Sequence, residues 1–160
     1  MRKILWLVFL WSLALQAPAQ SFEMEAVQEV YKGQIGETVK VPLRLTNPSD
    51  KPVSLIIRRI SSALGGTQKS YFCPENTCLD QEVEDFLVRL GPHETLSDFH
   101  IALDAGLANG ISSAKYFIFN RNNPSEALEF DLNFAVEERS AKADIFTHPQ
   151  IIIHDVYPNP

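Results

Sequence analysis

Alternation of apolar and polar residues constrains the fold of this chain more than any other feature. Every second residue between positions 38 and 46 is apolar, and the same pattern recurs between residues 128 and 137. Alternate side chains of a β-strand point to opposite faces, so each run predicts a strand with one buried and one exposed face. A helix, with about 3.6 residues per turn, would mix both kinds of residue on every face.

Shorter apolar runs indicate further strands at residues 53–60, 85–90, 97–104 and 114–120, with looser candidates at 22–31 and 69–72. Pairs such as Gly65-Gly66 and Gly91-Pro92 separate these runs, as turns do. No run has a convincing helical period. We therefore predict an all-β fold for residues 20–137, an antiparallel immunoglobulin-like β-sandwich of seven or eight strands.

The N-terminus has the pattern of a secretory signal peptide. Arg2 and Lys3 precede an apolar run of twelve positions, and small residues follow at Ala17 and Ala19. We predict a signal peptide at residues 1–19 with cleavage before Gln20. The run is too short to cross a bilayer of roughly 30 Å, and no later run is long enough, so we expect no transmembrane segment in the mature chain.

The net charge of −6 argues against nucleic acid and against anionic membranes as partners, because both would be repelled. The signal-peptide pattern predicts a location outside the cytoplasm, secreted or on the cell surface after export through the periplasm.

Cys73 and Cys78 are the two cysteines of the chain, and four residues separate them. In an exported protein an even number of cysteines favours pairing, so we predict a local disulfide between them. Redox catalysis normally uses two intervening residues beside a helix start, and a zinc site needs two more ligands. None of the four histidines shows ligand spacing relative to these cysteines.

Candidate catalytic groups are sparse. Asp98, His100 and Asp104 alternate on one strand, with Ser97 or Ser112 as conceivable nucleophiles, but a solvent-facing strand surface accounts for them better. The acidic residues Glu82, Glu84 and Asp85 lack an opposed carboxylate for glycoside chemistry.

Residues 120–126 read as a hairpin loop of moderate length. Its Asn120, Asn122, Asn123 and Glu126 could ligate calcium, but turns use the same residue types. We therefore predict no enzyme activity, no cofactor and no metal.

The C-terminal tail runs from an apolar triplet at 151–153 into Tyr157-Pro158-Asn159-Pro160. This tail resembles the opening of the C-terminal sorting domain carried by cargo of the bacterial type IX secretion system. The remainder of such a domain is missing here. The resemblance implies a linker at 138–150, the start of a truncated sorting domain at 151–160, and the secretion machinery as a partner.

Residues 23–137 also resemble the immunoglobulin-like modules that precede such sorting domains. The resemblance lies in residues 39–47 and 52–57, in Leu90-Gly91-Pro92, and in residues 116–124 before the last alternating strand.

The expected function is a non-catalytic interaction or structural module of a secreted or surface protein. One alternative is a glycan- or receptor-binding adhesion module, which would expose some of Tyr31, Tyr71, Phe72 and Phe117. The other is a secreted hydrolase built on His93 or His100.

Overall fold

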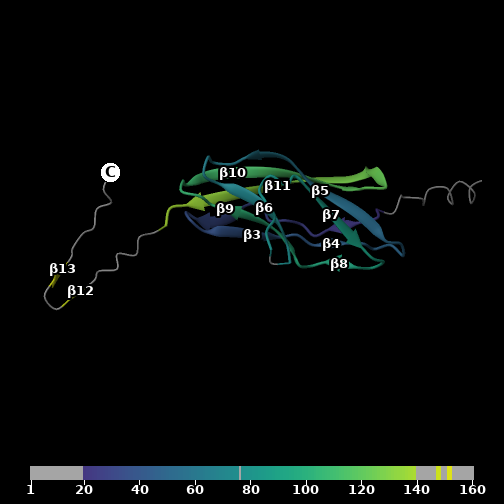
Figure 1. Cartoon of the computed structure of the whole chain (residues 1–160), viewed down its shortest axis with the longest axis horizontal. Helices are drawn as coiled ribbons and strands as arrows, with labels where there is room; N and C mark the ends of the chain where they lie inside the picture. The colour runs from purple at the N-terminus through teal and green to yellow at the C-terminus, as the bar shows by residue number, and fades with distance from the viewer. Residues whose placement is uncertain (1–19, 76, 140–146, 149–150, 153–160) are drawn as a thin grey trace, which may run out of the picture.

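The computed structural model of the chain describes residues 20–75, 77–139, 147–148 and 151–152. Its main body is two packed layers of β-strands (Figure 1). The first layer is a five-stranded sheet, in the order β2 (Tyr31–Gln34), β11 (Asn123–Glu137), β10 (Gly110–Asn120), β5 (Val53–Ala63) and β7 (Asp85–Leu90).

The second layer consists of two three-stranded sheets. One has the order β1 (Glu23–Met24), β4 (Leu45–Thr46) and β8 (Thr95–Leu96), and the other has β3 (Thr38–Pro42), β9 (Phe99–Asp104) and β6 (Lys69–Pro74). β3 continues into β4 and β8 into β9, and the N–H of Leu43 donates to the carbonyl of Phe99 across the break at 3.0 Å. The two small sheets are therefore successive parts of one layer.

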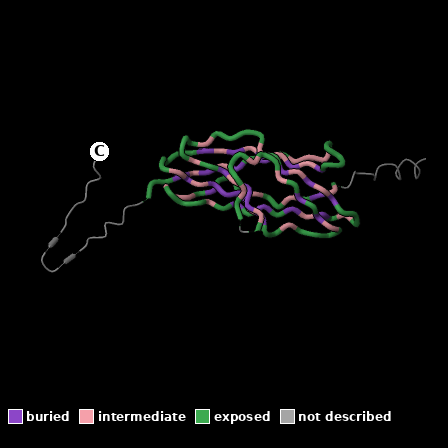
Figure 2. Tube along the Cα trace, viewed as in Figure 1, coloured by how far each residue is buried: buried purple, intermediate pink, exposed green. Residues whose placement is uncertain are grey.

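The predicted all-β immunoglobulin-like sandwich is confirmed. In the first alternating run Val41, Leu43 and Leu45 are buried, and burial alternates with exposure along the strands (Figure 2). A break at residues 43–44 divides the predicted strand at 38–46, and the looser candidate at 22–31 contains β1 and only the first residue of β2. β8 lies just before the predicted strand at 97–104, so the body contains more separate strands than the sequence indicated. The pairing of β2 with β11 is parallel, which no local pattern predicted.

The connection between β10 and β11 is tighter than the predicted loop at 120–126. Asn120 already pairs with Asn123, so β11 begins three residues after β10 ends. The side-chain oxygen of Asn120 accepts the N–H of Asn122 at 2.9 Å. The Asn120 side chain thus accepts an N–H that a backbone carbonyl would accept in a longer loop.

The core is aromatic where the two layers meet. Tyr116 is fully buried, and its ring stacks on Phe130 with centroids 5.5 Å apart and meets the edge of Phe72 at 5.9 Å. Its hydroxyl shares a hydrogen bond of 2.8 Å with the buried hydroxyl of Ser70, which satisfies both polar groups. Burial raises the pKa of Tyr116, so the phenol stays neutral.

Arg59 closes the side of the sandwich near β6. Its guanidinium donates to the carbonyl of Ser70 at 2.9 Å and to those of Gln81 and Val83. The N–H of Leu79 donates to the carbonyl of Phe72 at 2.8 Å. The segment before β7 is therefore tied across the outer edge of β6.

The remaining described strands, β12 (Thr147–His148) and β13 (Ile151–Ile152), pair with each other. They span the boundary between the expected linker and the expected sorting segment. The predicted signal peptide at 1–19 and the motif Tyr157–Pro160 lie outside the described residues. In the described part of the chain, no helix is long and apolar enough to cross a membrane.

Gly106 provides a test of the turn after β9. Its φ is +67°, and a Cβ there would lie 2.5 Å from the hydroxyl of Thr67 and 2.8 Å from the Thr67 backbone. We expect Gly106→Ala to lower the free energy of unfolding by roughly 1–3 kcal/mol, measured by urea denaturation.

Gly66→Ala is the matched control, because nothing lies within 4 Å of a Cβ built there. This change should alter stability by no more than about 0.5 kcal/mol. Equal effects of the two substitutions would contradict the close approach of Gly106 to Thr67.

Candidate functional site

The outer face of the five-stranded sheet carries a row of apolar side chains. Ile56 on β5 lies in register with Phe119 on β10 and with Leu87 on β7, and Phe117 follows on the same face of β10. The rings of Phe117 and Phe119 have centroids 5.5 Å apart. Leu87 keeps 42% of its surface exposed, and the other three are half-buried. We call these four residues the outer-face patch.

An ion pair borders this patch. Arg58 on β5 lies opposite Asp85 on β7, and its Nε and Nη2 donate to the two carboxylate oxygens at 2.6 Å each. The hydrogen bond from Arg58 lowers the pKa of Asp85. The guanidinium carbon also lies 5.5 Å from the ring centroid of Phe119. The pairing thus fixes a planar cation beside an aromatic ring.

The expected exposed aromatics are only partly at the surface. Tyr31 and Phe72 are buried in the core, and the Tyr71 hydroxyl donates to Asp104 at 3.2 Å. Phe117 does lie on the outer face, beside Phe119, which the sequence reasoning did not include. The run of apolar residues on both sides of the strand between 116 and 119 was the signal that could have identified it.

A groove runs between β7 and the segment 94–99. It has a volume of about 460 Å³ and is lined by residues 74–75, 86–89 and 94–99. The lining mixes apolar side chains such as Phe86 and Leu96 with the carboxylates of Glu94 and Asp98. β7 and β8 exchange no ladder pairing across it among the described strands. The groove therefore leaves the edge of β7 uncovered.

The predicted disulfide between Cys73 and Cys78 is present. Sequence spacing related no histidine to these cysteines, but the β6–β9 ladder places His100 opposite Cys73. The two sulfurs and the imidazole lie within 4.8 Å of one another. In the disulfide neither sulfur is a thiolate, the form that binds metal ions, so this cluster offers one ligand in its oxidised state. Sequence spacing could not show a contact made between strands.

The candidate catalytic residues do not converge. Ser112 is buried on β10, while Ser97 and Asp98 are exposed before β9. Asp104 accepts hydrogen bonds from Thr38 at 2.8 Å and from Tyr71. In the described part of the chain, no hydrogen bond joins His100 to a serine or a carboxylate.

The acidic and amide clusters are likewise engaged in local contacts. Asp85 pairs with Arg58, which is the residue opposite it on β5, so it faces a base there and not a second acid. At the β10–β11 turn the amides of Asn120 and Asn123 donate to the carboxylate of Glu126, at 3.3 and 2.7 Å. The Ser21 hydroxyl and these amides lower the pKa of Glu126. Because N–H donors already occupy this carboxylate, the turn does not gather free oxygens as a calcium ion requires.

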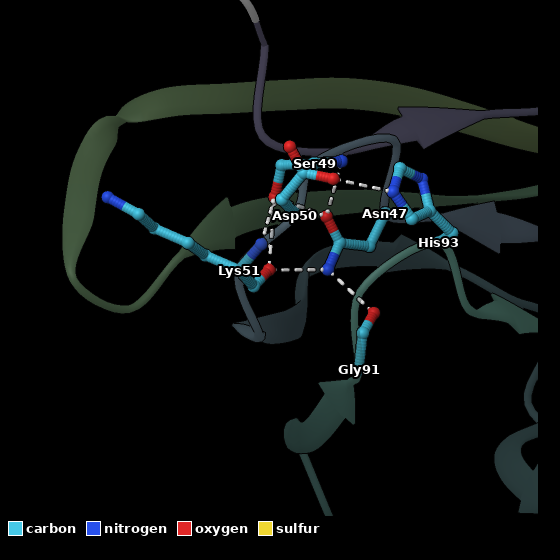
Figure 3. Close-up of polar contacts among 6 residues, drawn as sticks. All are labelled: Asn47, Ser49, Asp50, Lys51, Gly91 and His93. Carbon is cyan, nitrogen blue, oxygen red and sulfur yellow. Dashed lines mark hydrogen bonds and ion pairs between the residues drawn. The ribbon is translucent and has the colours of Figure 1, made fainter.

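His93 belongs to a polar network that holds the loop after β4 (Figure 3). Asn47 is buried, and its amide donates to the carbonyls of Lys51 at 2.8 Å and Gly91 at 2.7 Å. Its oxygen accepts from Ser49. His93 contacts Asp50 at 2.9 Å on the exposed side of this network. Among the described residues His93 forms a hydrogen bond with Asp50 and with no nucleophile, so its role is to stabilise this loop.

The comparisons place the fold. No family model matches the chain, and no curated protein matches it. The N-terminal domain of PorA is similar in structure, with a TM-score of 0.54 and 16% identity over 72% of this chain and 97% of that one. PapD-like domain 7 of human CEP192 has a TM-score of 0.51 and 14% identity over 78% of this chain and 90% of its own. At these identities the likeness shows the sandwich fold alone.

His100 offers a test of the site geometry. Burial, with a smaller contribution from the charge of Lys40, lowers the pKa of this imidazole below its ordinary value of 6.5. We expect an NMR titration to place His100 below 6.5, and Lys40→Gln to raise the value only in part.

Because the unfolded chain binds this proton more readily, His100 contributes stability above pH 6.5 that is lost as the pH falls through its folded pKa. His100→Gln should remove that part of the pH dependence. A titration of His100 at or above 6.5 would show that the side chain is not packed as described.

Proposed function

We propose that the sandwich is a non-catalytic interaction module of an exported protein and that it contacts its partner through the outer-face patch. The observation that carries the proposal is the apolar row on a solvent-facing sheet surface, bordered by a fixed ion pair. Apolar surface that is grouped in this way costs free energy in water, and a partner recovers that free energy by covering it.

Two features of exported proteins support this assignment. The signal-peptide pattern at residues 1–19 and the disulfide between Cys73 and Cys78 are both typical of proteins that fold outside the cytoplasm. We further propose that the protein is type IX secretion cargo, on the basis of the Tyr157–Pro160 motif. The gene sequence beyond Pro160 tests this part. A continuing alternating pattern supports it, and an immediate stop codon would leave only a secreted sandwich.

Glycan binding is a second candidate, and the ring pair of Phe117 and Phe119 favours it. Exposed aromatic faces bind the apolar faces of sugar rings, and the nearby Arg58 and Asp85 supply hydrogen-bonding groups. A glycan array separates the two candidates, because binding to the array that requires both rings would identify a sugar ligand.

The test uses the full chain in an exporting bacterium, with cells and medium separated and immunoblotted. We expect Phe117→Ser/Phe119→Ser to shift the protein from the cell surface into the medium by about ten-fold, because central apolar anchors dominate contact surfaces.

The control variant is Ile111→Ser, at an 87% exposed position near the far end of β10. It should partition as the unsubstituted protein does, and circular dichroism should show that all variants fold. Equal partitioning of the patch variant and the control would refute the role of the patch.

A further inference from the structure

The outer edge of β7 is open for strand pairing. The N–H of Arg59 donates to the carbonyl of Glu84 at 2.8 Å, which fixes the alternation of backbone groups along the β5–β7 ladder. By that alternation, Phe86, Val88 and Leu90 direct their N–H and C=O groups toward β5. Asp85, Leu87 and Arg89 direct theirs away, and the described strands include none that pairs with this side of β7.

The same three outward residues have self-complementary side chains. Asp85 and Arg89 carry opposite charges and stand two residues on either side of Leu87. When two β7 strands run antiparallel about a two-fold axis at Leu87, each Asp85 faces the other copy's Arg89 and the two Leu87 residues meet. Opposite charges and apolar pairs directly across strands both stabilise a sheet.

Hydrogen-bond geometry selects the same register as the charges. With Leu87 opposite Leu87, every residue whose backbone groups point outward faces another such residue, so each pair can exchange both N–H···O bonds. A slip by one residue would place outward groups opposite inward ones. A slip by two residues would restore the hydrogen bonds. In one direction it would place Arg89 opposite Val83, and in the other direction it would place Asp85 opposite Gly91, so the charged pairs would be lost.

The groove beside β7 leaves room for the strand of a second copy, and the outer-face patch extends the contact. The groove beside residues 86–89 separates β7 from β8, so no described strand covers this edge of β7. Leu87 is the last member of the outer-face patch on this side. A second copy would continue that apolar row across the two-fold axis. It would also bring its Arg89 to the carboxylate that Arg58 already holds.

We propose that the protein forms a two-fold dimer by antiparallel pairing of β7 with β7 of a second copy, which joins the two five-stranded sheets into one. Each copy then contributes Leu87 to the patch of the other. The dimer shares Leu87 with the outer-face patch but does not require the function proposed above, because it depends on the strand edge and not on Phe117 or Phe119, the residues that the partitioning test changes.

The experiment is sedimentation equilibrium of the mature protein across a range of concentrations. We expect a monomer–dimer equilibrium whose dissociation constant rises by about ten-fold or more in Leu87→Lys and in Arg89→Asp. In Arg89→Asp the introduced carboxylate faces Asp85 of the other copy. Ile111→Lys makes a comparable change on the same sheet face away from β7, and it should leave the dissociation constant unchanged.

Two variants with reversed charges distinguish loss of the dimer contact from misfolding. Asp85→Lys and Arg89→Asp should each be predominantly monomeric, and an equimolar mixture should form a heterodimer because the opposite charges then face each other again. Loss of the in-chain pair in Asp85→Lys is tolerable because Arg58 and Asp85 are both about half exposed.

An unsubstituted protein that stays monomeric at all concentrations would overturn the proposal, as would a dimer that Leu87→Lys and Arg89→Asp leave intact. The predicted cell-surface partitioning does not depend on this result, so either proposal can fail alone.

Discussion

The structure depends on burial of the inward side chains between the two layers of strands. Tyr116, Phe72 and Phe99 fill the space where the layers meet, and the hydroxyl shared with Ser70 satisfies the polar group that this packing buries. Because alternate residues of each strand are committed to this core, the residues between them must cover the outer faces. Apolar residues at those outer positions, as on β10, therefore have no structural role in the core and become candidates for contact with a partner.

Strand edges impose the second constraint, because their N–H and C=O groups need partners. The edge of β6 is satisfied within the chain by Leu79 and by the guanidinium of Arg59. No described strand pairs with the outer edge of β7, and the residues that face outward there are one acid, one base and one leucine. The outer-face patch and the open edge meet at Leu87, so the surfaces available for recognition lie together on the five-stranded sheet.

Alternation predicted most strands and their buried faces because it is a local property of the sequence, and the Cys73–Cys78 disulfide followed from an equally short separation. Contacts between strands were not predictable in this way. His100 meets Cys73, and Arg58 meets Asp85, only through ladder registers that turns and breaks determine. The apolar run at 116–119 indicates a strand with two apolar faces, but only the ladder register shows that Phe119 lies beside Ile56 in the patch. The short turn after Asn120 required a side-chain hydrogen bond that composition alone does not indicate.

Amide hydrogen exchange along β7, measured by NMR at a concentration where the monomer predominates, shows whether the outer edge of this strand is open. Alternation of backbone groups predicts slow exchange at Phe86, Val88 and Leu90, which donate to β5, and fast exchange at Leu87 and Arg89, which face solvent. Slow exchange at Leu87 and Arg89 equal to that of their neighbours would mean that the chain covers this edge itself, and β7 would then have no open recognition surface.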